Sequence, residues 1–428
     1  MPTTRTTRTT TTAPSAGPRL PEVRSITGLR IVAALWVLLF HWKFTPGPEY
    51  DGVKAFLRPL LDSGHLGVDL FYVVSGFVIT LTYLDSMGRR PSAAAWGRFW
   101  WARVCRVWPA YALVVVLFGV WLLWRRSVVG PGGFIAYQET QPDLGVGSWV
   151  RQLLLVQLWT RPDFDGASFV GATWSVSAEW AAYVVFPVLV LVLFRLRRLP
   201  WWLLAAGAVA LMLPAAWRSY ATGEIYWDHS WVERIGTGFG SGALACLAVT
   251  RLREREGAAA RAARWAPFLT WVVLAETVVV VLWAADRPYD RYTVVTVLFP
   301  LLVGLLALSD MGAGAGGTAG RGVAGWLSRP AVVLGGRISY SVYLVHVPVY
   351  EIFWTLQTEN PQIAPGGPWT ALLVPNLPLL ALLLGWVLWR FVEEPARRRL
   401  RDLGKRAGQG RAGRRGADPV QRAAPVSG

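Results

Sequence analysis

The chain has 428 residues, of which 54% are hydrophobic and 16% are charged, and a formal net charge of +17. Its mean hydropathy is +0.37. A water-soluble chain of this length would carry far more charge, so the composition argues against a soluble enzyme and predicts a membrane protein.

Ten apolar runs follow one another along the chain. Most approach the ~20 residues that a helix needs to cross ~30 Å of hydrocarbon. They are apolar throughout rather than alternating, which indicates helices and not barrel strands. We therefore predict an all-α, polytopic membrane helix bundle with about ten transmembrane helices. The runs cover roughly residues 28–45, 67–84, 107–124, 176–194, 200–216, 236–250, 266–284, 292–309, 338–355 and 370–390.

The distribution of basic residues predicts the orientation. With the amino terminus in the cytoplasm, 30 of the 43 Lys and Arg residues fall inside and 11 outside. Basic residues flanking spans set topology, so both termini are predicted to be cytoplasmic. Topology and anionic lipid headgroups account for the positive charge, and no nucleic-acid partner is expected.

The two ends of the chain are predicted to be disordered, basic cytoplasmic tails. Residues 1–24 are rich in Thr, Arg and Pro, and residues 401–428 in Gly, Ala and Arg, so neither segment can bury enough apolar surface to fold. The membrane domain occupies residues 25–400. Its largest exterior loop, 125–174, contains an amphipathic piece from Trp149 to Trp159 that is expected to lie on the membrane or to cap a cavity.

Cysteine usage indicates neither a disulfide framework nor a zinc site. Cys105 and Cys246 both lie at or inside apolar stretches, and their spacing is not that of metal ligands. Cys105 has basic neighbours but no other mark of a nucleophile, so we interpret it as structural. No metal and no permanently bound cofactor are expected.

The first span carries two ionisable residues that the membrane should not tolerate without a partner or a cavity. Arg30 and His41 are eleven residues apart, which places both on one helix face about 16 Å apart along the axis. One interpretation is that Arg30 reaches the headgroups and His41 is a hydrogen bonder inside the bundle. The other is that the pair is functional.

Further polar residues recur near the ends of other spans. Asp69 opens the second span and is expected to pair with a basic group, while Ser75-Gly76 indicate close helix packing. Arg103 and Arg106 share a helical face and could grip a phosphate, although a cluster that merely sets topology is the simpler reading.

The fourth and ninth spans supply the remaining candidates. Glu179 needs a proton, a partner or water, and a carboxylate within reach of an imidazole would support a general base. Ser339, Tyr343 and His346 are spaced to share one face of the ninth span.

Together these residues resemble the acyltransferase-3 family, integral membrane O-acyltransferases that modify sugars on bacterial surface polysaccharides and on macrolide-type natural products. The resemblance covers about residues 24–400 and rests on six motifs in order. They are Gly28-Leu29-Arg30 with His41, Gly67-Val68-Asp69-Leu70-Phe71 with Ser75-Gly76-Phe77, Arg103-x-x-Arg106 with Pro109, Trp174-Ser175-x-Ser177-x-Glu179, Ser339-Tyr340-Ser341-x-Tyr343-Leu344-x-His346, and Glu393-Glu394-Pro395.

The resemblance implies an acyl-CoA-dependent O-acyltransferase in the bacterial cytoplasmic membrane. A short acyl group, acetyl by family frequency, would move from cytosolic acyl-CoA to a sugar hydroxyl on a glycan or a glycosylated natural product, with Arg30 and His41 essential. Acyl-CoA would be a cosubstrate, and the acceptor and the lipid bilayer would be the other partners.

Within that reaction, His41 is expected to be the general base, because an imidazole titrates near working pH. Arg30, Arg103 and Arg106 would hold the phosphates of CoA, and Glu179 would lend carboxylate support. The residues expected on the acceptor side or in support of the reacting groups are Asp69, Ser177, Tyr343 and His346.

Two alternatives remain open at this stage. An acyl-His41 intermediate could replace direct transfer. A proton-coupled transporter could use Asp69, Glu179, Glu276 and His41 as a relay, although the paired broken helices typical of that class are not evident in the sequence.

Overall fold

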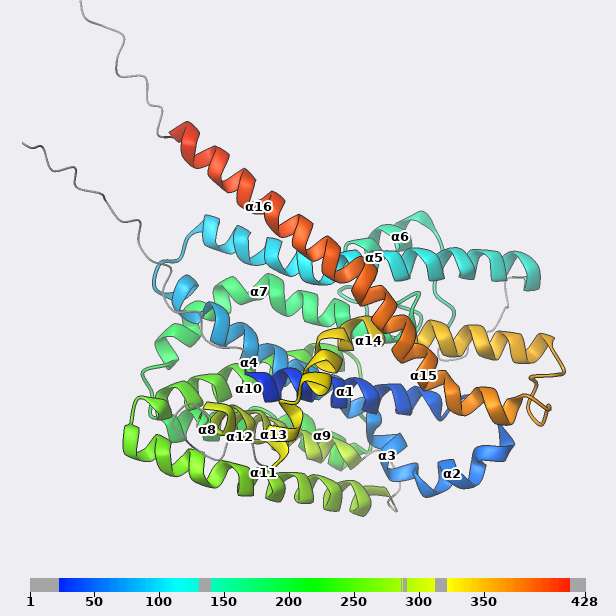
Figure 1. The fold of residues 1–428 in the computed structure, drawn as a ribbon, viewed down its shortest axis with the longest axis horizontal. Helices are drawn as coiled ribbons and strands as arrows, with labels where there is room; N and C mark the ends of the chain where they lie inside the picture. The colour runs from blue at the N-terminus through cyan, green and yellow to red at the C-terminus, as the bar shows by residue number, and fades with distance from the viewer. Residues whose placement is uncertain (1–22, 131–139, 286, 288–290, 312–321, 416–428) are drawn as a thin grey trace, which may run out of the picture.

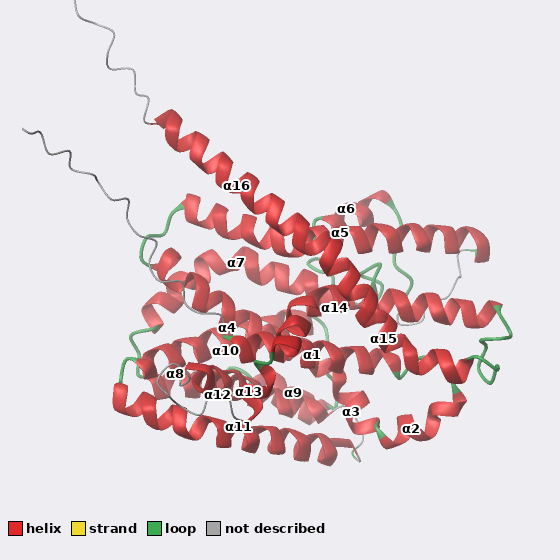
Figure 2. Ribbon diagram, in the orientation of Figure 1, coloured by secondary structure: helices red, strands yellow, loops and turns green. Residues whose placement is uncertain are grey.

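The computed structural model describes residues 23–130, 140–285, 287, 291–311 and 322–415. Within these ranges every regular element is a helix (Figure 2). The long helices lie side by side, with α1 in the middle of the bundle (Figure 1). The longer elements are α1 (Arg24–Trp42), α4 (Gly67–Gly88), α5 (Ala93–Val129), α7 (Trp174–Leu196), α8 (Trp201–Ala210), α9 (Leu213–Thr222), α10 (Ser230–Arg253), α11 (Glu256–Ala285), α12 (Phe299–Met311), α14 (Pro330–Glu359), α15 (Thr370–Leu388) and α16 (Glu394–Arg415).

Short helices connect these elements. Between α1 and α4 the chain forms four short helices of one or two turns, and the 3₁₀ helix η3 directly precedes α7. The short elements are η1 (Pro48–Tyr50), α2 (Asp51–Phe56), α3 (Arg58–Asp62), η2 (Ser63–Leu66), α6 (Val146–Leu153), η3 (Gly171–Thr173), η4 (Arg291–Leu298), α13 (Gly322–Leu327) and the π-helical turn η6 (Trp389–Glu393).

The ten predicted spans are confirmed. Ten helical stretches in the described ranges are long and apolar enough to cross a membrane. The chain is thus an all-α, multi-pass membrane protein. The orientation predicted from the basic residues stays a prediction.

Several boundaries differ from the prediction for local reasons. The fifth span is two helices, because Pro214 in the first turn of α9 cannot donate a backbone hydrogen bond to α8. The third span was predicted from residue 107, but its helix begins at Ala93, so Arg103 and Arg106 lie inside that helix. The sixth begins at Ser230, which brings Arg234 into α10. The helix α16 continues past residue 400, where we placed the start of the C-terminal tail, to Arg415.

Three helix contacts lie at the centre of the bundle. α1 packs along α14, and α4 packs along α10 and α7. A glycine on each helix allows α4 and α10 to approach closely. A Cβ on Gly76 of α4 would overlap the carbonyl oxygen of Phe239, and a Cβ on Gly242 of α10 would overlap that of Val73. Small residues allow membrane helices to approach this closely, so the packing predicted for Gly76 is confirmed.

We expect Gly242→Ala to destabilise the protein by roughly 1–3 kcal/mol, because the added methyl group has no space against the backbone of α4. Gly236→Ala is the matched control on the same helix, since its Cβ would meet no atom within 4 Å. The measurement is the free energy of unfolding in detergent. Equal stability of the two variants would show that the α4–α10 contact is not tight.

Candidate active site

A buried cavity of about 130 Å³ lies between α1, α4, α5, α7 and α14. It gathers residues from five of the six sequence motifs and opens between helices that are far apart in the chain. The predicted site residues in its lining are Arg30, Arg103, Arg106, Glu179 and Tyr343, and other polar residues there are Tyr72, Ser75, Ser175, Tyr183 and Tyr340.

Arg30 is the cation that α1 contributes to the cavity. Among the residues that the structure describes, no carboxylate lies within ion-pair distance of its guanidinium, although the charge of Glu179 acts on it across the cavity. A buried cation without a close anion favours an anionic or strongly polar ligand nearby.

Arg103 and Arg106 enter the cavity from the first half of α5, as their spacing predicts, but their surroundings differ. Arg103 is flanked by the rings of Tyr83, Phe99 and Tyr183 and donates to the Tyr83 hydroxyl at 3.2 Å. The Nε of Arg103 is buried without a hydrogen-bond partner. Arg103 therefore keeps a donor for a ligand.

Arg106 already has an anionic partner. It forms an ion pair with Glu393, which is fully buried and also accepts a hydrogen bond of 2.6 Å from Ser341. Glu393 is part of a motif in the sequence, yet its approach to α5 is a tertiary contact that helix periodicity does not reveal. The positive charge of Arg106 is thus balanced within the protein.

His41 lies against the imidazole of His346, 305 residues further along the chain. Nδ1 of His346 is 2.6 Å from the Tyr343 carbonyl oxygen, so it carries the proton, and Nε2 of His346 is left as an acceptor. Nδ1 of His41 is 3.2 Å from that Nε2 and 3.0 Å from the Val37 carbonyl oxygen. Both neighbours are acceptors, so Nδ1 of His41 is a donor and the lone pair of a neutral His41 is on Nε2.

Glu179 lies in the cavity lining and is hydrogen-bonded within its own helix. Its hydrogen-bond partner in the described part of the chain is Tyr183, which donates to Glu179 Oε1 at 2.6 Å and lies 3.2 Å from the Ser75 hydroxyl. The polar side chain hydrogen-bonded to His41 is that of His346. Glu179 therefore belongs to the arginine-lined part of the cavity, where its charge faces Arg30.

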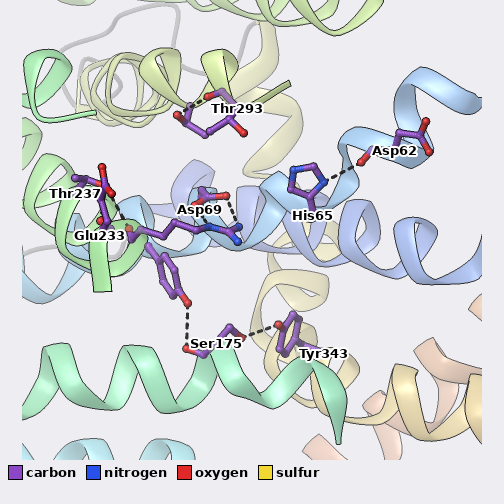
Figure 3. A network of polar contacts seen from close by, with 11 residues as sticks. Asp62, His65, Asp69, Ser175, Glu233, Thr237, Thr293 and Tyr343 are labelled. Atoms are coloured by element: carbon purple, nitrogen blue, oxygen red, sulfur yellow. Dashed lines mark hydrogen bonds and ion pairs between the residues drawn. The ribbon is translucent and has the colours of Figure 1, made fainter. Parts of the chain in front are cut away.

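Two serines of the Trp174–Glu179 motif have different roles. Ser175 points toward Tyr343, with 2.7 Å between their hydroxyl oxygens, and both line the cavity (Figure 3). The ring of Tyr343 lies next to that of His346, which links the cavity to the imidazole pair. Ser177 is fully buried and donates to the Leu155 carbonyl oxygen at 2.8 Å, so its hydroxyl holds the loop before α7.

Asp69 has the basic partner that we predicted. Arg234 of α10 donates to both carboxylate oxygens at 2.8 and 2.9 Å, and both side chains are almost fully buried (Figure 3). Arg234 is not among the predicted site residues, because the sixth predicted span begins at residue 236, two residues after it. An ionisable residue next to a span end is the signal that would have found it.

The ten-span helical bundle surrounds a cavity that collects arginines and has an imidazole pair beside it, which an integral membrane enzyme requires but which does not by itself define one. The comparison with protein families gives the class directly: a model described as an acyltransferase domain matches residues 23–400. The chain therefore belongs to the acyltransferase-3 family, and the resemblance based on its motifs is confirmed. Membership does not favour the proton-coupled transporter.

Curated relatives agree with this family. The chain is 30% identical over 200 residues to the acyltransferase MdmB of Streptomyces mycarofaciens, which is 46% of each protein. It is 24% identical over 195 residues, 46% of this chain and 28% of the relative, to the peptidoglycan O-acetyltransferase OatA of Listeria monocytogenes. It is also 24% identical over 171 residues, 40% of this chain and 24% of the relative, to the putative peptidoglycan O-acetyltransferase YrhL of Bacillus subtilis. The matches thus span less than half of these relatives' length, and no solved structure matches the chain.

Proposed function

We propose that this protein transfers a short acyl group, acetyl in the first instance, from acyl-CoA to a sugar hydroxyl of a glycan or a glycosylated natural product. The proposal places it in the bacterial cytoplasmic membrane with both termini in the cytoplasm. The observation that carries it is the imidazole pair of His41 and His346 beside an arginine-lined cavity.

The donor side of the reaction falls to the arginines. Arg30 and Arg103 have donors for the phosphates of CoA, whereas Arg106 would have to exchange Glu393 for a phosphate. The cavity is smaller than the about 300–1,000 Å³ of a site that holds a whole small molecule. It would therefore take the slender pantetheine arm, with the nucleotide outside at the arginine end.

The reacting groups would meet at the imidazole end. Arg30 and His41 are separated by about three helical turns, or 16 Å, which the pantetheine arm would cover. The acceptor oxygen attacks the thioester carbon, its proton passes to Nε2 of His41, the C–S bond breaks, and the proton returns to the CoA sulfur. The bond between Nδ1 of His41 and His346 would hold the imidazole in the reactive tautomer and stabilise the imidazolium.

The experiment is binding and turnover of radiolabelled acetyl-CoA by the purified protein, with an extract of the producing cell as acceptor. Label that moves into a glycan or glycoside supports the proposal and identifies the acceptor. Label that remains on the protein after rapid quenching would favour an acyl-His41 intermediate over direct transfer. A protein that binds no short acyl-CoA would contradict the proposal.

Arg30→Ala is expected to weaken acetyl-CoA binding by about tenfold or more while the bound donor still reacts, because a charge-assisted hydrogen bond to phosphate is lost far from the thioester. Equilibrium binding of acetyl-CoA and the split between KM and kcat measure this. Arg89→Ala is the matched control, since Arg89 is a largely exposed arginine that pairs with Asp85 away from the cavity. A fall confined to kcat would place Arg30 in the chemical step instead.

A further inference from the structure

A second cavity, of about 220 Å³, lies in the segment between α5 and α7. It is more than ten times larger than the space that one buried water needs. It is lined by polar side chains and backbone, from Asp143 to Ala167. The side chains that matter below are Asp143, Arg151, Gln152, Gln157 and Arg161.

Two residues of the lining have buried hydrogen-bond acceptors without partners. Gln152 and Gln157 are 1% and 3% exposed. Nε2 of Gln152 donates to the Ala167 carbonyl oxygen, and Nε2 of Gln157 donates to the Tyr111 hydroxyl. The Oε1 atoms of both glutamines have no hydrogen-bond partner. Buried polar atoms are nearly always paired, so these two oxygens indicate a ligand or water.

The rim supplies donors and one carboxylate. The side chains of Arg151 and Asp143 are 49% and 69% exposed and lie 4.0 Å apart, and Nε of Arg161 is buried without a partner. The lining thus presents two unpaired acceptor atoms together with one unpaired donor atom. A sugar satisfies both kinds of atom with the same group, since each hydroxyl donates one hydrogen bond and accepts others.

The cavity lies close to the imidazole pair. Gln157 is 3.4 Å from the Thr173 carbonyl oxygen, while the hydroxyl of Tyr343 donates to the carbonyl of the preceding residue, Ala172. Tyr343 in turn lies against His346. One short backbone segment therefore separates this cavity from the groups proposed to perform the transfer. Arg103 of the arginine-lined cavity lies beside Tyr183, about two helical turns from Ser175 along α7.

From this geometry we infer that the cavity between Asp143 and Ala167 is a carbohydrate subsite that holds a sugar unit of the acceptor. The term acceptor rests on the proposed function, whereas binding of a sugar does not. The hydroxyls of the sugar donate to Oε1 of Gln152 and Gln157 and accept from Arg161 and Arg151. The loop expected from the sequence to cap a cavity has this role in recognition, and α6, which lies beside α5, forms part of its wall (Figure 1).

The test is equilibrium binding of sugars to the purified full-length protein in detergent. The probes are glucose, galactose, rhamnose, N-acetylglucosamine and the β-linked tetramer of N-acetylglucosamine. At least one is expected to bind the wild type, and Gln157→Leu should raise its Kd about tenfold, because one buried hydrogen bond is lost. Gln362→Leu, on an exposed glutamine far along the chain, is the matched control and should bind like the wild type.

Arg151→Ala is the second variant, because a half-exposed rim residue can be removed without loss of folding. It should weaken binding of the same sugar several-fold. No binding of any probe to the wild type, or equal Kd values in the wild type and both variants, would overturn the inference and leave a cavity that holds water.

The same variants separate this inference from the proposed function. Acyl transfer with an unchanged acceptor KM in Gln157→Leu would contradict the subsite alone. A protein that binds the sugar in this cavity but binds no acyl-CoA would contradict the proposed function and leave the sugar site standing.

Discussion

His41→Ala is expected to abolish acyl transfer, with turnover lower by about 10²–10⁴-fold and acetyl-CoA binding unchanged. The physical reason is that Nε2 of His41 is the proposed proton acceptor, and general-base catalysis contributes a factor of this size. Arg30 and Arg103, which would hold the phosphates, remain in place. Turnover and equilibrium binding of radiolabelled acetyl-CoA in the same preparation measure both effects.

The matched control replaces a histidine that lies outside the proposed site. His229 is exposed and has a positive φ of 62°, which asparagine tolerates, so His229→Asn should leave turnover unchanged. Wild-type turnover of the His41→Ala variant would contradict the mechanism.

Replacing His346 tests whether it positions His41 or takes the proton itself. Because Nε2 of His346 accepts from His41 and does not itself take the proton, His346→Gln should lower kcat by about tenfold and leave the KM for acetyl-CoA unchanged. A loss as large as that of His41→Ala would instead make His346 the reacting group.

Asp69→Ala is expected to cost about 3–5 kcal/mol of stability, the largest structural effect that we predict. The substitution leaves the guanidinium of Arg234, 6% exposed, inside the bundle without its carboxylate. The pair also joins α4 to α10, and Arg234 lies over the Trp174 ring at the start of α7. The free energy of unfolding in detergent measures the loss.

Two comparisons sharpen this prediction. Asp85→Ala is the control, because Asp85 pairs with Arg89 and Arg197 at the surface, where an ion pair contributes less than about 1 kcal/mol. The double variant Asp69→Ala/Arg234→Met removes both charges and should recover part of the stability. A double variant as unstable as Asp69→Ala would mean that the loss does not come from an unpaired charge.

The architecture followed from the sequence to a large extent. Apolar runs of about 20 residues have one solution in a bilayer, a helix, so the ten spans could be counted without a structure. The shared face of Arg30 and His41 and that of Arg103 and Arg106 also followed, because helical periodicity fixes the relative direction of side chains on one helix. The same reasoning predicted a basic partner for Asp69 but not its identity.

Only the tertiary structure decided which residues meet between helices. Three contacts join side chains that composition and spacing do not bring together: His346 lies beside His41, Arg234 pairs with Asp69, and Glu393 pairs with Arg106. Residues on one helix are related by a fixed rise and rotation, whereas residues on two helices are related only by how those helices pack, which depends on small residues such as Gly76 and Gly242 at each crossing.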